Sequence, residues 1–453
     1  MKKTFSWLIV MILIVSIVVG FSFVGCKAAE EPPAEEPPAE EPAEEVDPAS
    51  FVGEINLMAF NDEFDQMIPM FNEVYPNIKV NFEKVPSGEI VQKLEAAFDA
   101  GVGVPDVFVG EQAWMMRWMV LDVWENLSAE PYNADEVAAD HFDYVKDFAR
   151  DEDGNLRSLT WQATPGAIFY RRSFADEAFG VSEPDEVSAL MPDMDSFIEM
   201  GRTLKKNGVA LIPGVNDIQR LFFFNKKQPW VVDGKLVIED IVLDYMDVAK
   251  TIRDEGLDAK IDMWSPEWFA GMNGNIFSYC MPTWGLFFTI EPAITPPEEP
   301  EEGVEYAFGD VGLAHGPASY MWGGTWLGIS KTSEKKDLAW EFVKFMTTDK
   351  EFLKEWALES GDFVSDRAVV EEIKDGYSRE SLGGQNHYEY FYQEALALSE
   401  SGWAQRVTQY DEDIQNAFLT ALGEYVNGNL TKDEAIQSFK DEVASKFPEI
   451  TVE

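Results

Sequence analysis

Residues 54–109 alternate between short apolar runs and amphipathic segments, and this pattern constrains the fold more than any other feature of the chain. Alternation at Glu54–Phe60 predicts a strand, and helical spacing of apolar residues predicts a helix over Glu63–Val74. The next elements expected are a strand at Ile78–Val85, a helix at Gly88–Ala100 capped by Ser87, and a buried strand at Pro105–Val109. This order is typical of a parallel, doubly wound α/β sheet.

Length and charge narrow the class of protein. The chain has 453 residues, which suggests about two domains, and 46% of them are hydrophobic, enough to bury two cores. Lys and Arg total 35 against 83 Asp and Glu, so the net charge is −48. Such a surface repels phosphate backbones, which disfavours nucleic-acid binding and favours an extracellular protein.

The N-terminus has the features of an export signal. Lys2 and Lys3 precede the apolar run Leu8–Val19, which predicts a signal peptide at residues 1–25. The segment Phe23–Cys26 resembles the lipobox of bacterial lipoproteins, which implies that Cys26 is lipidated. The alternative is a plain membrane anchor with an incidental cysteine. Either way the protein is expected outside the cytoplasm, held at the membrane, on the cell surface or in the periplasm.

Residues 26–50 form the predicted tether, and Cys280 lies far beyond it. The tether contains EEPPAEEPPAEEPAEE, in which proline blocks helix and glutamates repel one another, so an extended and solvated segment is expected. If Cys26 is lipidated, Cys280 has no disulfide partner and is expected to fill the core.

Five segments resemble family 1 extracellular solute-binding proteins, the sugar-binding components of ABC importers. Two are in the first part of the chain, FNEVYPNIKVNFEKVP and KLEAAFDAGVGVPDVFVG. The others are SLTWQATPGAIFYRRSF at Ser158–Phe174, MDSFIEMGRTLKKNG at Met194–Gly208, and GGTWLGISKTSEKKDLAWEFVKFMTTDKE. Their order and spacing match the family over most of residues 51–370.

The resemblance implies a two-lobed α/β fold of the periplasmic-binding-protein type II class, with helices flanking a sheet in each lobe. The first lobe is expected at residues 51–162 plus about 310–360, and the second at residues 163–309 plus about 361–453. The implied function is capture of a mono- or oligosaccharide in the cleft between the lobes and delivery to the membrane subunits of an ABC importer. The protein is expected to be a monomer and not an enzyme.

Candidate ligand-binding residues follow the predicted strands, because ligands of open α/β sheets bind at the carboxyl ends of strands. Sugars stack on aromatic faces and need planar polar partners for their hydroxyls. The predicted site therefore comprises Asn61, Asp62, Glu63, Glu111, Gln112, Trp161, Gln162, Trp284, Trp322, Gly323, Gly324 and Asp362. Trp264, Trp268 and Trp326 remain open between core and site, and Asp362 is equally consistent with a turn after a helix.

The segment Met321–Trp326 is the most distinctive part of this set. The glycine pair Gly323–Gly324 allows a close backbone approach, although a simple turn would use it too. Trp326–Ser330 is expected as a strand, followed by a helix with a Ser/Thr cap whose Trp340 and Phe345 face a core. Further helices are expected at Tyr388–Glu400, Asp411–Val426 and Thr431–Phe447.

Two other functions are compatible with the composition. A secreted glycoside hydrolase or other cleft enzyme also needs carboxylates and tryptophans, and a receptor for a cation such as a polyamine would use the negative charge. His141, His315 and His387 are widely spaced and no nucleophile elbow, P-loop or zinc motif is present in the sequence, so no metal or cofactor is expected. Asp151–Asn155 is expected as a hairpin turn rather than a calcium loop.

Overall fold

The computed structural model describes residues 46–300 and 303–453. The predicted signal peptide, Cys26 and most of the predicted tether lie outside the described residues, as do Glu301 and Glu302. Asp47–Glu453 forms one compact unit. The tether prediction is wrong at its end, because Pro48–Ser50 forms a short 3-10 helix in which the Asp47 carboxylate accepts from the Ala49 N–H at 2.9 Å.

A five-stranded sheet contains the strands predicted at the start of the chain. Its order is β2-β1-β3-β10-β4. The strands are β1 (Gly53–Ala59), β2 (Ile78–Lys84), β3 (Val107–Glu111), β4 (Leu159–Thr160) and β10 (Thr325–Ile329). β1 pairs in parallel with β2 and β3, which confirms the doubly wound prediction, whereas β10 runs antiparallel between β3 and β4.

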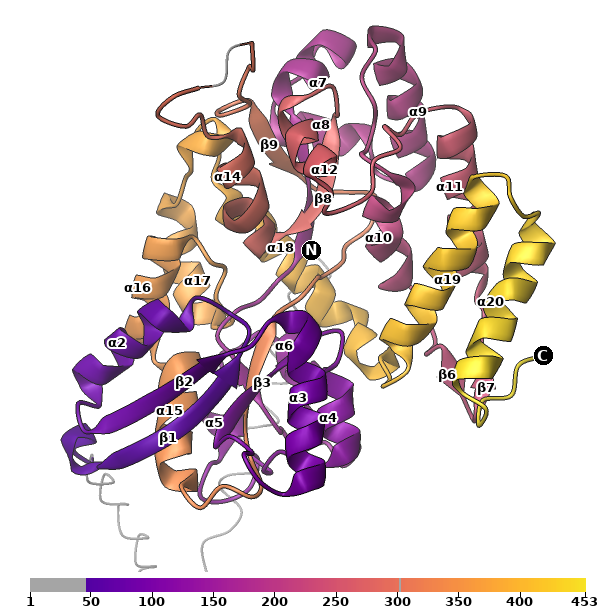
Figure 1. Ribbon diagram of the computed structural model, residues 1–453. Helices are drawn as coiled ribbons and strands as arrows, with labels where there is room; N and C mark the ends of the chain where they lie inside the picture. The colour runs from indigo at the N-terminus through magenta and orange to yellow at the C-terminus, as the bar shows by residue number, and fades with distance from the viewer. Residues whose placement is uncertain (1–45, 301–302) are drawn as a thin grey trace, which may run out of the picture. The chain divides into compact units, whose positions relative to one another are not determined.

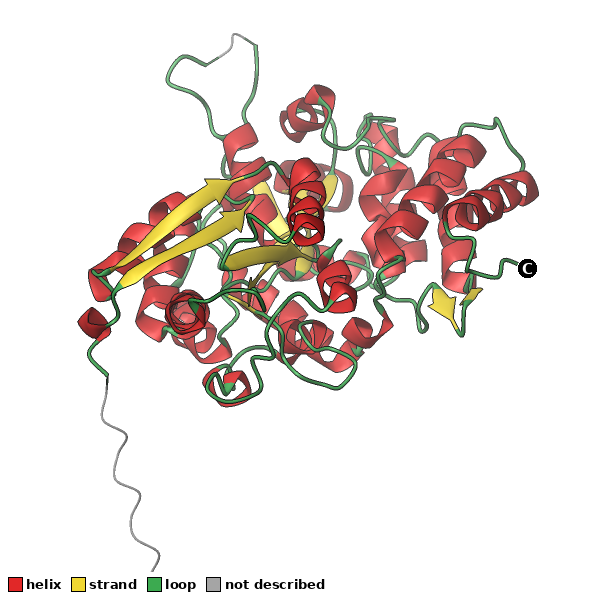
Figure 2. Ribbon diagram, turned by 60° about the horizontal axis from the view of Figure 1, so that its bottom comes forward, coloured by secondary structure: helices red, strands yellow, loops and turns green. Residues whose placement is uncertain are grey.

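A second sheet has three strands, β8 (Ser278–Pro282), β5 (Gly166–Arg171) and β9 (Val311–Ala314), in the order β8-β5-β9. Both pairings of β5 are antiparallel. The chain therefore passes from the first sheet to the second between β4 and β5, and returns between β9 and β10. A separate pair, β6 (Val231–Val232) and β7 (Lys235–Leu236), lies beside the C-terminal residues (Figure 2).

Helices surround these sheets (Figure 1). In the first part of the chain they are α2 (Phe64–Val74), α3 (Ser87–Ala100), α4 (Met115–Leu121), α5 (Ala134–Val137), α6 (Asp143–Phe148), α7 (Arg172–Phe179), α8 (Pro184–Leu190), α9 (Met194–Leu204), α10 (Gln219–Phe223) and α11 (Asp240–Asp254). The remainder are α12 (Pro266–Ala270), α13 (Thr283–Gly285), α14 (Glu291–Ile294), α15 (Lys336–Thr348), α16 (Lys350–Ser360), α17 (Arg367–Ile373), α18 (His387–Ser401), α19 (Asp411–Val426) and α20 (Lys432–Lys446). Among the described residues, every helix is too short or too polar to span a bilayer.

The predicted C-terminal helices are confirmed as α18, α19 and α20, and α19 lies between α11 and α20 (Figure 1). Thr431 and Glu434 form the capping box that starts α20. Two predicted caps are wrong. Ser87 is the first residue of α3, after Pro86, and α15 begins after Lys335 without a side-chain cap. Ser333 instead donates its hydroxyl to the Asp106 carboxylate at 2.6 Å.

Core predictions agree closely with the packing. Trp340 and Phe345 of α15 are buried. Trp268 and Trp326, for which both interpretations were open, are core residues with no exposed surface. Cys280 is a buried free thiol. The hairpin turn at Asp151–Asn155 is confirmed by pairing of Arg150 with Leu156.

The division of the chain between the two lobes stays a prediction. Pairing places β9, at residues 311–314, in the second sheet, although the expected boundary lay at about residue 310. Gln162 pairs with Val364, and Phe363 packs against Phe142, so residues after 360 also contact the first part of the chain. Residues 411–450 instead join the hydrophobic cluster that contains α9, α10 and α11.

Candidate functional site

A cavity of about 410 Å³ lies where the two sheets meet. We call it the tryptophan cavity, and it is lined by Phe60, Asn61, Asp62, Glu63, Glu111, Gln162, Trp264, Phe269, Trp284, Phe288, Thr289, Gly323, Gly324 and Thr325. Its volume is within the usual range for small-ligand sites. The lining separates into a polar wall and an aromatic wall.

The polar wall is built at the ends of strands of the first sheet. Asn61, Asp62 and Glu63 follow β1, and Glu111 is the last residue of β3. The Asn61 amide contacts the Thr325 hydroxyl of β10 at 3.0 Å, which fixes its side chain. Burial raises the pKa of Glu63, and burial raises the pKa of Glu111 to about 7. At neutral pH Glu111 can therefore act as either a proton donor or a proton acceptor.

The aromatic wall comes from segments next to the second sheet. Trp264 and Phe288 are 46% and 50% exposed, so both present a large apolar surface to a ligand in the cavity. Trp264 also has a φ of 69°, a left-handed conformation that bulky residues rarely adopt. Trp268, whose indole N–H donates to Asp217 at 2.7 Å, packs against Trp264 at 5.2 Å between ring centroids. The fold thus holds an aromatic face open toward the polar wall.

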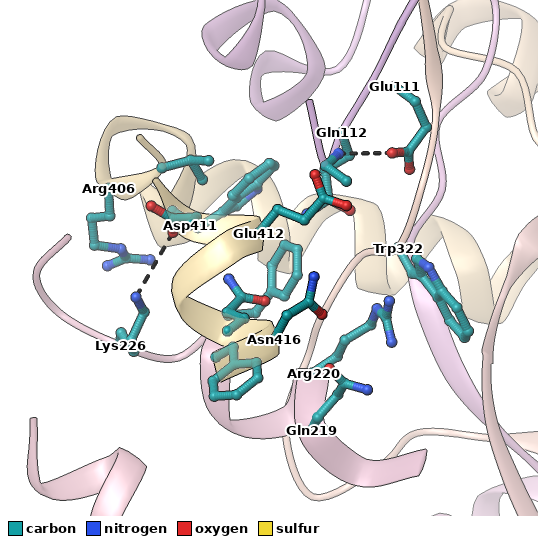
Figure 3. Close-up of a pocket in the computed structure, with 16 residues that line it drawn as sticks. Glu111, Gln112, Gln219, Arg220, Lys226, Trp322, Arg406, Asp411, Glu412 and Asn416 are labelled. Carbon is teal, nitrogen blue, oxygen red and sulfur yellow. Dashed lines mark hydrogen bonds and ion pairs between the residues drawn. The ribbon is translucent and has the colours of Figure 1, made fainter. Parts of the chain in front are cut away.

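A second cavity, of about 190 Å³, adjoins the first at Glu111. We call it the arginine cavity. It is lined by Glu111, Gln112, Ala113, Gln219, Arg220, Phe223, Phe224, Lys226, Trp322, Trp403, Arg406, Val407, Asp411, Glu412, Gln415 and Asn416. In Figure 3, Arg220 extends beside Trp322, and Lys226 and Arg406 lie near Asp411. The Arg220 guanidinium carbon is 3.4 Å from the centroid of the Trp322 ring.

The glycine pair separates the two cavities. Gly323 and Gly324 have φ values of 79° and 101°, where side chains are strongly disfavoured. A Cβ on Gly323 would lie 2.7 Å from the Trp284 indole nitrogen. The Gly323 N–H donates to the Gln112 side-chain oxygen at 3.0 Å, and the Trp284 N–H donates to the Trp322 carbonyl at 2.8 Å. Glycine is therefore needed at both positions, because the backbone is left-handed and because tryptophan rings pack closely against it.

Most of the predicted ligand-binding residues lie together. Asn61, Asp62, Glu63, Glu111, Gln162, Trp284, Gly323 and Gly324 line the tryptophan cavity. Gln112 and Trp322 line the arginine cavity, where Glu111 also lies.

Trp161 and Asp362 were expected in the cleft, but neither lines the tryptophan cavity or the arginine cavity. Both residues are fully buried. The Asp362 carboxylate accepts N–H bonds from Trp161, Gln162 and Trp356 at 3.3–3.4 Å. Burial raises the pKa of Asp362 to about 7, and nearby Glu63 adds to the rise. Trp161 and Asp362 are therefore placed to hold the Gln162 side chain in position.

Sequence reasoning missed most of the arginine cavity. Gln219, Arg220, Lys226, Asp411, Glu412 and Asn416 come from helices and turns far from the predicted strand ends. The pattern of apolar residues does not predict these positions. The helix α10 has only five residues, and its apolar residues indicate a core position rather than a binding site. Phe269 and Phe288 in the tryptophan cavity were missed for the same reason.

Comparison with known proteins identifies the family. Residues 66–374 match the family model described as bacterial extracellular solute-binding protein. A solved extracellular solute-binding protein family 1 structure has a TM-score of 0.75 at 19% identity, covering 86% of this chain and 99% of its own.

Two further similar structures are binding proteins, one of them in complex with a sugar. The ABC transporter associated binding protein of B. animalis subsp. lactis Bl-04, in complex with beta-1,6-galactobiose, has a TM-score of 0.67 at 21% identity, covering 89% and 100%. The sugar-binding protein MalE of Xanthomonas citri has a TM-score of 0.65 at 20% identity, covering 87% and 97%. The likeness establishes a two-lobed fold, and with the family match it shows that the chain belongs to the bacterial extracellular solute-binding proteins.

Proposed function

We propose that this protein captures a carbohydrate in the tryptophan cavity and delivers it to the membrane subunits of an ABC importer. The observation that carries this proposal is the pairing of exposed aromatic faces, Trp264 and Phe288, with a wall of carboxylate and amide groups. Apolar C–H faces of a sugar stack on aromatic rings, while its hydroxyls bond to planar polar groups. The structural relatives crystallised with sugars are consistent with this assignment.

The protein acts by binding and not by catalysis. Ligand contacts to both walls favour the closed arrangement of two lobes, which the importer then recognises. A glycoside hydrolase would need two carboxyl groups placed on opposite sides of one glycosidic bond. Asp362, whose pKa is raised to about 7, is buried in the core and lines neither cavity, and Glu63 and Glu111 both belong to the polar wall on one side of the tryptophan cavity. Incubation with oligosaccharides is expected to release no product, and steady release would make the protein an enzyme.

Replacement of Trp264 by alanine is expected to weaken saccharide binding by about 2 kcal/mol, roughly 30-fold, because the stacking face is lost. A thermal-shift screen of mono- and oligosaccharides against polyamines first identifies ligands, and calorimetry on the variant then measures the affinity. Phe308→Ala is the matched control, since Phe308 is 43% exposed and lines neither cavity. Stabilisation by polyamines alone would favour the cation receptor instead.

We also propose that the mature protein functions as a monomer, anchored outside the cytoplasm by a lipid on Cys26. Replacement of Cys26 by serine is expected to abolish labelling with an alkyne fatty acid and to release the protein from the membrane fraction, because the acceptor thiol is lost. Cys280→Ser is the control, as Cys280 is buried and unreactive. Labelling that persists in Cys26→Ser, or that disappears in Cys280→Ser, would contradict the anchor.

A further inference from the structure

The arginine cavity holds a positive charge that makes no hydrogen bond or ion pair with the part of the chain that the structure describes. Arg220 stacks on Trp322, yet within the described residues its guanidinium makes no hydrogen bond and no ion pair, and its Nη1 is buried with no partner. The Arg220 side chain as a whole is half-buried, but a guanidinium N–H that is hidden from water and has no acceptor is costly. Burial lowers the pKa of Arg220 to about 10, so the side chain is still charged at neutral pH.

Two of the carboxylates that line the cavity, Asp411 and Glu111, bond to groups other than Arg220. Asp411 accepts from the N–H and hydroxyl of Thr408 at 2.9 and 2.6 Å, and it lies 3.8 Å from Lys226 Nζ. Glu111 accepts from the Ala113 N–H at 2.8 Å, and its pKa of about 7 leaves it close to half protonated at neutral pH. Burial also raises the pKa of Glu412. Glu111 and the buried Asp217 lie near enough to raise the pKa of Arg220, but neither forms a hydrogen bond or an ion pair with its guanidinium.

The positive groups are correspondingly undersatisfied. Lys226 is 4% exposed, and its ammonium has no hydrogen-bond partner among the described residues. Arg406 also lines the cavity, and burial lowers its pKa. The lining of this small chamber thus contains three cations beside three carboxylates, in a protein whose net charge is −48. The chamber is smaller than a typical complete ligand site, so it suits one group of a larger ligand.

We propose that the arginine cavity binds the carboxylate of a uronic acid unit, with Arg220 as its partner, so that the ligand is an acidic saccharide whose remaining part lies in the tryptophan cavity. This inference rests on the proposed carbohydrate function. A guanidinium whose carbon lies 3.4 Å over a ring does not use its N–H groups for that contact, and its edge matches a carboxylate with two parallel N–H bonds. Glu111 belongs to both cavities and, when protonated, donates to the bound carboxylate.

Calorimetry with matched disaccharides tests the proposal. The probes are digalacturonate against galactobiose, dimannuronate against mannobiose, and cellobiouronic acid against cellobiose. At least one uronate is expected to bind 10-fold or more tightly than its neutral counterpart, and raising the salt concentration is expected to weaken only the uronate. Uronates that bind no better than neutral sugars would overturn the inference and leave the proposed function intact. Failure of every saccharide to bind would overturn both.

Variants at Arg220 test whether this residue causes the preference for uronates over neutral sugars. Arg220→Gln is expected to lower uronate affinity roughly 10- to 100-fold and neutral-sugar affinity less than 5-fold, since only the charge-assisted bonds are lost. Arg220→Lys keeps the charge without the planar fork and is expected to fall between the two. Arg117→Gln is the control, because Arg117 already pairs with Asp413 at 3.2 Å and lines neither cavity.

The melting temperature of Arg220→Gln without ligand shows whether the substitution affects folding as well as binding. Because the Arg220 guanidinium forms no hydrogen bond or ion pair with the described residues, Arg220→Gln is expected to leave the melting temperature unchanged or higher. Equal losses of affinity for uronates and neutral sugars would mean that Arg220 pairs with a protein carboxylate on closure, and would overturn the assignment.

Discussion

Replacement of Asp362 by alanine is expected to lower the free energy of unfolding by about 3–5 kcal/mol, because several buried donors lose their acceptor at once. The Asp362 carboxylate accepts from the Trp161, Gln162 and Trp356 side chains at 3.3–3.4 Å and from the Phe363 N–H at 2.9 Å. All four donors are buried with it. Chemical denaturation with fluorescence detection measures the loss, and tryptophan is a direct reporter here.

Asp362→Asn is the matched variant for this prediction. Its oxygen can keep the three side-chain donors, but its amide faces the Phe363 N–H, so a loss of about 1–2 kcal/mol is expected. The order of stability should therefore be wild type, Asp362→Asn and then Asp362→Ala. Equal losses in both variants would show that the hydrogen bonds are not what Asp362 contributes. Saccharide affinity in Asp362→Asn should change little if the residue only supports Gln162.

The first sheet could be predicted from the sequence because local patterns determine it. β1, α2, β2, α3 and β3 follow one another with short connections, and each has the period of its own element. Their sequential order also gave the parallel pairing. The helix caps were less predictable. Ser87 and the serines before α15 have capping chemistry, but Ser333 bonds to Asp106, a residue more than two hundred positions away.

The polar wall of the tryptophan cavity could be predicted from local sequence patterns, whereas the arginine cavity could not. Asn61, Asp62, Glu63 and Glu111 were predictable because strand ends in a parallel sheet meet at one edge. Trp161 also follows a strand, but its indole N–H turns inward to Asp362, which the sequence does not reveal. Arg220 lies on a five-residue helix, and its contact with Trp322 joins positions about a hundred residues apart. Long-range contacts of this kind have no local signature.

Replacement of His387 by phenylalanine is expected to stabilise the protein, and by more in acid than in base. His387 is 1% exposed, and neither ring nitrogen has a hydrogen-bond partner among the described residues. It lies among Tyr377, Tyr388 and Phe391, with ring centroids 5.1–6.1 Å away. Removing two unsatisfied polar atoms from an aromatic cluster is expected to gain roughly 1–3 kcal/mol at pH 8.

The pH dependence follows from the direction of the pKa shift. Burial, with a smaller contribution from Arg379, lowers the pKa of His387 to about 3, whereas the unfolded chain binds a proton near pH 6.5. Below pH 6.5 only the unfolded state is protonated at this residue, so the wild-type free energy of unfolding falls as the pH drops toward 3. At pH 5 the variant escapes this loss, which adds about 2 kcal/mol to its advantage.

His141 supplies the contrast that makes the result specific. It is also buried, and burial lowers its pKa to about 4, but its Nε2 lies 2.8 Å from the Thr347 carbonyl oxygen. His141→Phe leaves that carbonyl without its partner, so at pH 8 it is expected to lose about 1–3 kcal/mol where His387→Phe gains. Urea denaturation of both variants at pH 8 and pH 5 gives the four values. A gain for His387→Phe that is equal at the two pH values would show that His387 titrates normally in the folded protein.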